Sequence, residues 1–286
     1  KDEVMATVGI NLIVRDCEDT LVVCLESIRG LWDRLLVVDT GSKDDTVTLA
    51  QSYGAEVLFH PWTDDFSDAR NFGWEKLDTD YKFWLDADDI LVGREYFDEM
   101  VHKCEENGLD GVLLEYLYSL DDVGQKLLAK LEPLILSGQV PSEEVYRQLA
   151  PRCNTTQYRE RLVRNDPTWR WVYPVHEALP AVGHRMGKYD KVRVIHRRHV
   201  RSVQAHSGRN LEILNKVPME RRDERIWFYF GLEYASANRP DEAIVAFEKY
   251  LPMSTVEDER YLVHCFLGDL HRSKNDSDRA IRSYLR

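Results

Sequence analysis

Several features that mark other protein classes are missing from this sequence of 286 residues. No apolar run reaches the length of a transmembrane helix, and the N-terminus carries no secretory signal pattern. The five cysteines are odd in number and include no CxxC pair, which argues against a disulfide framework. We therefore expect a protein without membrane spans that works in a reducing, cytoplasmic compartment.

The chain also lacks a surplus of positive charge, since 38 Lys and Arg residues stand against 50 Asp and Glu residues and the formal net charge is −12. A chain this acidic is not expected to bind nucleic acid in general. Residues 147–225 are an exception, because basic residues outnumber acidic ones there. This basic segment suits a phosphorylated small molecule, although a solvated basic face is the alternative.

The N-terminal part of the chain alternates between apolar runs and helical patterns. Residues 8–14, 34–38 and 55–59 are predicted to be buried strands with helices between them. This order predicts an α/β protein with a right-handed parallel sheet. Neither GxGxxG nor GxxxxGK[ST] occurs, which disfavours the usual dinucleotide-binding and P-loop proteins.

Aspartates follow the predicted strands at the edge where sheets of this class bind ligands. They are Asp16, Asp39, Asp86, Asp88 and Asp89, the last three in the sequence FWLDADDI. Carboxylates at this spacing suit a divalent cation that takes further ligands from substrate phosphates. The alternative is a set of turn-capping aspartates on a solvated loop. Asp89 itself is expected to cap the element that follows it.

Arg70 lies in the first turn of a helix predicted for residues 68–77, where the helix dipole disfavours a cation. One explanation is that its guanidinium group faces a bound diphosphate. The alternative is an ion pair with Asp64 or Asp65. Ser67 is expected to cap this helix.

Four segments, in their order along the chain, resemble those of family 2 glycosyltransferases: IVRD, LVVDTGSKDDT, FSDARNFG and WLDADD. The resemblance is close over residues 8–91 and looser to about residue 214. It implies the A-type glycosyltransferase fold, which is Rossmann-like with a mostly parallel sheet. It also implies a UDP-sugar donor, a divalent metal ion (Mn²⁺ or Mg²⁺) and inversion at the anomeric carbon.

The same resemblance assigns roles to single residues. The ends of the first two strands are expected at the nucleobase, the ARN segment near the ribose and diphosphate, and the DxD motif at the ribose and metal. The expected donor-binding residues are Val14, Arg15, Asp16, Asp39, Arg70, Asn71, Asp86 and Ala87. Asp88 is the expected metal ligand. Relatives often carry Asn-Glu where this chain has Asp16-Cys17, so Cys17 is given no role.

The sequence Val175-His176-Glu177 resembles a segment near the acceptor in a subgroup of these enzymes. Direct displacement needs a general base to take the acceptor proton. Glu177 is the expected catalytic base and His176 the alternative. A third possibility is that both residues only orient the loop.

His196 follows a strand predicted for residues 192–195 and is expected to be a second metal ligand, with His199 as the alternative. A lone histidine is more often structural. Three nearby arginines, which could offset the charge of a leaving diphosphate, are Arg197, Arg198 and Arg201.

Two further segments depart from the sheet pattern. Residues 118–157 predict an amphipathic helical insertion on the acceptor side, or else a helix pair without substrate contact. In the C-terminal part, Gly231 and Gly268 are 37 positions apart, as are Phe247 and Tyr284. This spacing resembles tetratricopeptide repeats of about 34 residues.

The sequence therefore predicts a catalytic domain over residues 1–214 and all-α tetratricopeptide-like repeats over residues 215–286, truncated at the C-terminus. Two repeats leave a face uncovered, so a bound protein or peptide, or a homodimer, is expected.

The predicted function is metal-dependent, inverting transfer of a sugar from a UDP-sugar to an acceptor. The acceptor is a protein or peptide side chain, or a cell-wall or lipopolysaccharide saccharide. The alternative is a catalytically inactive transferase fold that binds partners through its repeats. The set Asp39, Arg70, Asp86 and Asp88 favours the enzyme.

Overall fold

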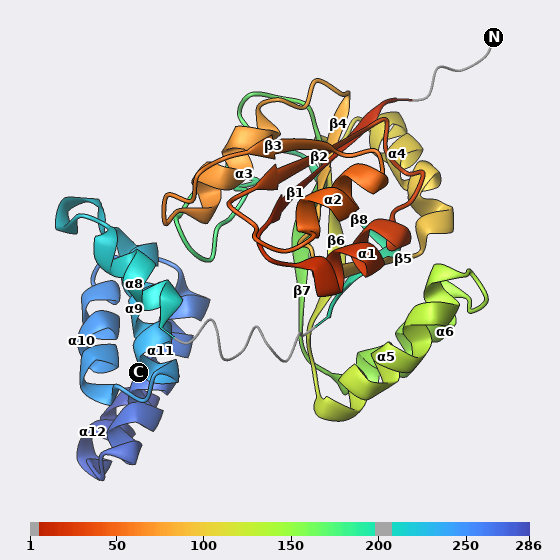
Figure 1. Ribbon diagram of the computed structural model, residues 1–286. Coiled ribbons are helices and arrows are strands. Elements are labelled where there is room, and N and C mark those ends of the chain that lie inside the picture. The colour runs from red at the N-terminus through yellow and green to blue at the C-terminus, as the bar shows by residue number, and fades with distance from the viewer. Residues whose placement is uncertain (1–5, 198–207) are drawn as a thin grey trace. The chain divides into compact units, whose positions relative to one another are not determined.

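The computed structural model describes residues 6–197 and 208–286, which form two compact units (Figure 1). The first unit contains residues 6–172 and 177–197, and the second contains residues 173–176 and 208–286. The boundary expected after residue 214 lies within a helix of the second unit. The expected fold class is confirmed, since an α/β unit is followed by a helical one.

Within the described residues, the first unit has one sheet of eight strands in the order β3-β2-β1-β4-β7-β6-β8-β5. The strands are β1 (Val8–Val14), β2 (Arg34–Asp39), β3 (Glu56–Phe59), β4 (Tyr81–Trp84), β5 (Asp89–Val92), β6 (Gly111–Leu120), β7 (Cys153–Arg164) and β8 (Met186–His196). β1 pairs in parallel with β2 and β4, as do β2 with β3 and β6 with β8. The other three pairings are antiparallel.

The continuous apolar run of β1 reflects burial on both faces of the sheet. On one face, Ile10 and Leu12 belong to the main core together with Leu21 of α1 (Glu18–Ser27). On the other, Ile13 packs in a smaller cluster with Phe72 of α3 (Phe66–Trp74). Two more helices complete the layers of this unit, α2 (Thr46–Ser52) and α4 (Phe97–Glu106).

Helix α3 differs from its prediction at both ends. It begins at Phe66 rather than residue 68, and Asp65 caps it by accepting a hydrogen bond from the Asp68 main-chain N–H. The expectation that Ser67 is the cap is therefore wrong, because Ser67 lies inside the helix and its hydroxyl donates to Asp65. With the earlier start, Arg70 lies at the middle of the helix, so the expectation that it lies in the first turn is wrong.

The segment between β6 and β7 forms two helices, α5 (Asp122–Leu136) and α6 (Ser142–Leu149). Residues at both ends of the expected insertion instead extend β6 and β7. Leu128 of α5 is buried and packs in one cluster with Leu117 and Leu120 of β6. The helices are thus attached to the sheet by an apolar contact of their own.

The second unit contains α8 (Arg209–Lys216), α9 (Glu224–Ser236), α10 (Pro240–Tyr250), α11 (Glu257–Ser273) and α12 (Ser277–Tyr284). Gly231 of α9 lies directly against the ring of Phe247, and Gly268 of α11 lies in the same way against Tyr284. A Cβ at either glycine would collide with that ring. The 37-residue spacing therefore corresponds to one helix-pair contact made twice.

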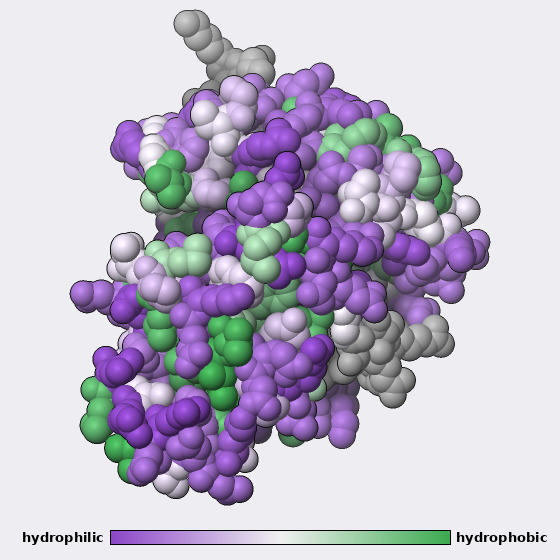
Figure 2. Space-filling model, turned by 90° about the vertical axis from the view of Figure 1, so that its left-hand side faces the viewer, coloured by the Kyte–Doolittle hydropathy of each residue, from purple (hydrophilic) through white to green (hydrophobic). Residues whose placement is uncertain are grey.

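The surface shown in Figure 2 is mostly hydrophilic, with apolar side chains in small groups. In the helical unit the exposed apolar side chains include Tyr261, Ile281 and Leu285. Among the residues that the structure describes, no helix combines the length and apolar character needed to cross a membrane. All five cysteines are free.

Candidate active site

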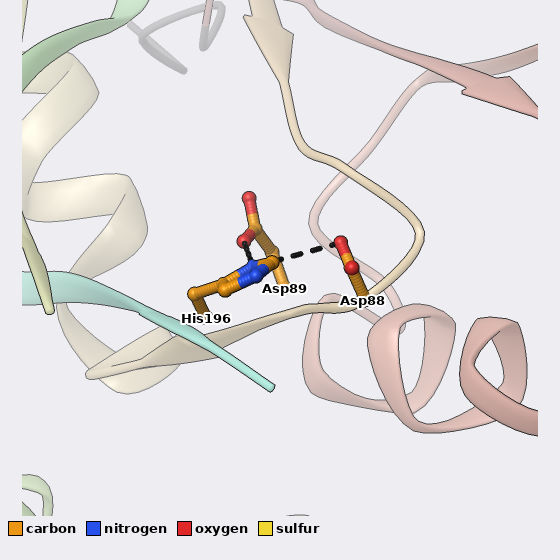
Figure 3. Close-up of side chains that lie close together, drawn as sticks. All are labelled: Asp88, Asp89 and His196. Atoms are coloured by element: carbon orange, nitrogen blue, oxygen red, sulfur yellow. Dashed lines mark ion pairs between the residues drawn. The ribbon is translucent and has the colours of Figure 1, made fainter. Parts of the chain in front are cut away.

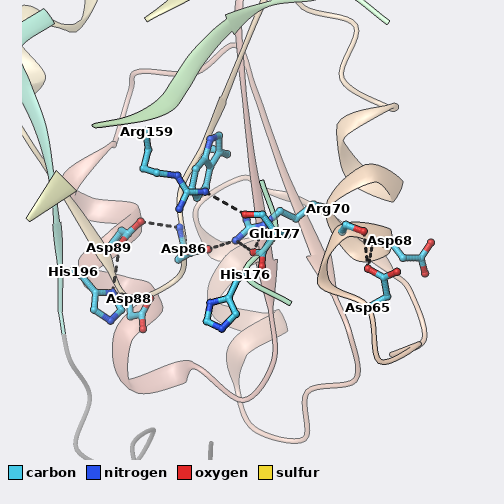
Figure 4. Close-up of polar contacts among 12 residues, drawn as sticks. Asp65, Asp68, Arg70, Asp86, Asp88, Asp89, Arg159, His176, Glu177 and His196 are labelled. Carbon is cyan, nitrogen blue, oxygen red and sulfur yellow. Dashed lines mark hydrogen bonds and ion pairs between the residues drawn. The ribbon is translucent and has the colours of Figure 1, made fainter. Parts of the chain in front are cut away.

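Arg70 is the centre of the candidate site because it joins two carboxylates from distant parts of the chain (Figure 4). Its Nη2 lies 2.5 Å from Asp86 Oδ1, and its Nε donates to Glu177 Oε1 at 2.8 Å. The guanidinium group lies 4.8 and 4.7 Å from the ring centroids of Trp84 and Trp171. The alternative of an ion pair with Asp64 or Asp65 is therefore wrong.

Burial and charge act against each other at this ion pair. Arg70 is 3% exposed, and Asp86 follows the buried strand β4. Burial alone would raise the pKa of Asp86, but Arg70 and, behind it, Arg161 outweigh that effect and hold the pKa below its ordinary value. The Asp86 carboxylate is thus kept ionised at the edge of the sheet.

Asn71 fixes the loop that carries Glu177. Its amide accepts a hydrogen bond from the Trp171 main-chain N–H and donates one to the Trp171 carbonyl, both at 2.9 Å. Both polar atoms of the Asn71 side chain are therefore hydrogen-bonded to the main chain of this loop. Arg159, on β7, also reaches this loop and donates to the Glu177 carbonyl at 3.3 Å.

The residues expected at the nucleobase come together at the ends of β1 and β2. Val14 is the register partner of Asp39, whose carboxylate accepts hydrogen bonds from the Gly41 and Ser42 main-chain N–H groups. Asp16 has a positive φ of 48° and accepts from the Lys43 main chain at 2.7 Å. The two strand-end loops are therefore tied to each other.

Two other expected donor residues differ in exposure. Arg15 has a half-exposed side chain whose Nε lies 3.9 Å from Asp16. Ala87 is buried, and its side chain belongs to the main core. Neither side chain contacts Arg70 in the described structure, so their donor roles stay predictions.

The expected metal ligands Asp88 and His196 lie side by side, although they come from different strand ends (Figure 3). His196 Nδ1 is 3.7 Å from Asp88 Oδ1 and 3.6 Å from Asp89 Oδ1. Ligand atoms of the three residues lie within 4.8 Å of one another. The His196 Nδ1 atom is buried and has no hydrogen-bond partner among the described residues. His199 lies outside the described residues.

Burial and neighbouring charges shift the pKa values of this cluster. Burial raises the pKa of Asp88 to about 7, with Asp89 and Asp86 raising it and His196 lowering it. Burial alone would lower the pKa of His196, but Asp89 and Asp88 raise it to about 9. A divalent cation would offset the charge of the two carboxylates, whose oxygen atoms are ligands that suit Mn²⁺ or Mg²⁺.

Asp89 is not a cap, contrary to expectation, because it begins strand β5 and is fully buried. Its Oδ1 accepts from the Tyr116 hydroxyl at 2.7 Å and its Oδ2 accepts from Arg161 Nη1 at 3.0 Å. Sequence reasoning missed both partners. The one signal was the charged residue at position 161 in the otherwise strand-like run RERLV.

The side chains of His176 and Arg197 pair with acidic residues that belong neither to the Arg70 contacts nor to the Asp88 cluster. His176 belongs to the second unit, where its Nε2 lies 2.7 Å from Glu233 Oε1. Arg197 pairs with Glu132 of α5 at 2.6 Å, and its main-chain N–H donates to the Asp88 carbonyl at 2.8 Å. Arg198 and Arg201 lie outside the described residues.

Comparisons with known proteins cover most of the first unit. The family model described as Glycosyl transferase family 2 matches residues 10–170. A TPR repeat-containing protein of Synechococcus elongatus is 33% identical over 61% of this chain and 36% of its own length. An uncharacterized glycosyltransferase of Rickettsia typhi is 29% identical over 38% of this chain and 37% of its own length. The chain thus matches little more than a third of either relative.

The fold of the chain also resembles that of a solved structure. Glucosyl-3-phosphoglycerate synthase from Mycobacterium tuberculosis, in complex with Mn²⁺, UDP and glucosyl-3-phosphoglycerate, has a TM-score of 0.43 and 19% identity. The alignment covers 73% of this chain and 78% of that one.

Proposed function

Because the chain belongs to glycosyl transferase family 2, we propose that it moves a sugar from a UDP-sugar donor to an acceptor, with a divalent metal ion and with inversion at the anomeric carbon. The observation that carries this proposal is the contact of Arg70 with both Asp86 and Glu177. That contact lies next to the Asp88–His196 pair, at the edge of the sheet where ligands of such folds bind.

For the donor, we assign the uracil to the paired ends of β1 and β2, with Val14, Asp16 and Asp39, flanked by Arg15. Asp86 and Ala87 then face the ribose. Arg70 and Asn71 lie on the side of the site next to the ribose and diphosphate. Arg70 shapes that side through its ion pairs, and Asn71 does so by holding the Trp171 loop.

For the metal, we assign Asp88 and His196 as protein ligands of Mn²⁺ or Mg²⁺. Such an ion stabilises the negative charge that develops on the leaving diphosphate. The assignment is supported by geometry, because Asp88 Oδ1 and His196 Nδ1 lie 3.7 Å apart beside a second carboxylate, that of Asp89.

For the base, we assign Glu177, with His176 as the alternative. Nε and Nη2 of the Arg70 guanidinium group contact Glu177 Oε1, and Nη2 also contacts Asp86. A donor ribose at Asp86 and an acceptor hydroxyl or thiol at Glu177 would therefore be placed relative to one rigid, planar group. Such positioning lowers the barrier by removing the need to bring the reactants together.

For the acceptor, we propose a protein or peptide side chain, because helical pairs that expose apolar side chains suit binding of a chain segment. A saccharide acceptor is the alternative. Formation of a homodimer through the helical unit is a further proposal. The five free cysteines suit a cytoplasmic site of action.

The first experiment measures UDP release from a panel of UDP-sugars, with Mn²⁺, with Mg²⁺ and with EDTA. We expect release from at least one donor that depends on the metal. Asp88→Ala should abolish metal-dependent donor binding measured by calorimetry. If no sugar nucleotide binds with either ion, the proposed function is wrong.

A second experiment tests the base. Glu177→Gln should bind donor normally but transfer sugar at least about 100-fold more slowly, since general-base catalysis contributes that much or more. Glu75→Gln is a matched control, because Glu75 also pairs with an arginine but lies on the surface. A fully active Glu177→Gln variant would remove Glu177 from this role.

A further inference from the structure

The turn that carries Asp88 is closed by two reciprocal hydrogen bonds. The Asp89 main-chain N–H donates to the Asp86 carbonyl at 3.0 Å, and the Asp86 main-chain N–H donates to Asp89 Oδ2 at 3.1 Å. The same turn is also held by the main-chain N–H of Arg197, directly after β8, which donates to the Asp88 carbonyl. The backbone around Asp88 is therefore fixed from both sides before any ligand arrives.

The second partner of this turn is a buried arginine. Arg161 is fully buried, and its guanidinium group lies between the rings of Trp84 and Tyr116, at 3.8 and 4.4 Å from their centroids. Its Nη1 donates to Asp89 Oδ2 and to the Trp84 carbonyl. Arg161 thus offsets the charge of Asp89 and cannot turn away from it.

Asp89 is poorly placed to bind a cation. Its Oδ1 accepts from Tyr116, its Oδ2 accepts from Arg161 and from the Asp86 main chain, and the residue is fully buried. A cation that still carries water could not reach it without displacing these donors. Asp88, in contrast, is partly exposed, with 30% of its side chain accessible.

We propose that Tyr116, Asp89 and Arg161 form a positioning network for the metal site, in which Asp89 orients the Asp88 turn and the His196 ring and is not a metal ligand. Asp89 Oδ1 lies 3.6 Å from His196 Nδ1, so the fixed carboxylate limits where the histidine ring can lie beside Asp88, whose Oδ1 is 3.7 Å from the same atom. This inference rests on the metal dependence in the proposed function.

The alternative is that Asp89 is a third ligand, in which case a bound Mn²⁺ ion keeps one water fewer than with Asp88 and His196 as its protein ligands. Broadening of the Mn²⁺ resonance in water enriched in a magnetic oxygen isotope counts these waters, and the lower count would overturn the assignment of Asp89 as a residue that does not bind the ion. If Tyr116 helps to hold Asp89 in place, Tyr116→Phe removes a fixed contact of that carboxylate, and metal affinity falls. Loss of such a supporting contact typically costs about 10-fold or more in metal affinity.

The experiment titrates Mn²⁺ into the full chain with UDP present and follows free Mn²⁺ by electron paramagnetic resonance. Tyr116→Phe should weaken Mn²⁺ binding about 10-fold. Tyr118→Phe is the matched control, because this tyrosine is on the same strand and stacks on His196 at 5.3 Å. No hydrogen bond joins Tyr118 to Asp89 among the described residues, so Mn²⁺ affinity should change less than about twofold. The thermal midpoint of each variant without metal shows whether folding is unaffected.

A further variant keeps the test independent of Tyr116. Arg161→Lys keeps the charge but loses the planar group between two rings, so it should also weaken Mn²⁺ binding and leave UDP binding in EDTA unchanged. Unchanged or tighter Mn²⁺ binding by Tyr116→Phe would overturn the positioning role alone. A wild-type protein that binds UDP but no Mn²⁺ would overturn both this inference and the metal dependence, while leaving donor binding intact.

Discussion

Loss of Arg70 should destabilise the first unit. Arg70→Met would leave the partly buried carboxylates of Asp86 and Glu177 without the cation that they share, which we expect to cost about 3 kcal/mol, the low end for a buried pair, because a third of the Asp86 side chain is exposed. Urea denaturation, followed by fluorescence, measures this loss. The control is Arg34→Met, because Arg34 also joins two carboxylates, Glu56 and Asp78, but at the surface.

The expected cost of Arg34→Met is below about 1 kcal/mol, since water screens exposed ion pairs. Equal effects of the two substitutions would show that burial does not set the strength of the Arg70 contacts.

The lowered pKa of Glu233 predicts that the stability of the helical unit depends on pH. Burial alone would raise its pKa, but His176 and Asn210 outweigh burial and hold the pKa below the ordinary value of 4.5. A carboxylate whose pKa is lower in the folded state contributes stability above its unfolded pKa. That contribution is lost as the pH falls through the lowered folded pKa.

Glu233→Gln should therefore destabilise the helical unit at pH 7, by about 1.5 kcal/mol for a hydrogen bond to a charged group. The variant should also lose part of the decrease in stability below pH 4.5. Urea denaturation at several pH values, followed by circular dichroism, measures both effects. Parallel pH profiles for variant and wild type would contradict the prediction.

At the scale of elements, the two helices between β6 and β7 stabilise the sheet by packing against it, whatever their role toward an acceptor. Leu128 is 1% exposed, and Leu128→Ala should cost about 2–5 kcal/mol because it leaves a cavity against β6. Leu134, on the same helix, is 39% exposed, and Leu134→Ala should change stability by no more than about 0.5 kcal/mol. Thermal denaturation of the two variants compares them directly.

Helix α5 also reaches the candidate metal site, through the ion pair of Glu132 with Arg197. Glu132 holds Arg197, which follows His196 directly and whose main chain holds Asp88. If Leu128→Ala caused no loss of stability, α5 would be a loosely packed lid, and its packing against the sheet would not contribute to stability.

At the scale of the whole molecule, a bound donor should stabilise one unit selectively. UDP with Mn²⁺, at about 100 times the dissociation constant, adds about 2.7 kcal/mol to the stability of the state that binds it. All assigned donor and metal residues lie in the first unit. Hydrogen exchange should therefore slow in β1, β2, β4 and α3. Equal protection across α9–α12 would show that the donor is bound elsewhere.

Much of the fold follows from local patterns. The apolar run of β1 predicts a central strand because only such a strand is buried on both faces. The DxD turn is recognisable because its carboxylates are neighbours in sequence. The 37-residue spacing of glycine and aromatic residues records a contact between adjacent helices. Each of these features depends on residues that are close along the chain, or on a spacing that repeats.

The partners of the charged residues were decided only by tertiary structure. Arg70 meets Glu177 across 107 positions, and Arg161 meets Asp89 across 72. These choices depend on the strand order, which places antiparallel β7 beside β4, and on the register between them. From the sequence alone, Asp64 or Asp65 was a possible partner of Arg70, and Asp89 was expected to be a cap. A buried charge pairs with whichever opposite charge folding brings to it, and that is a property of the packed sheet.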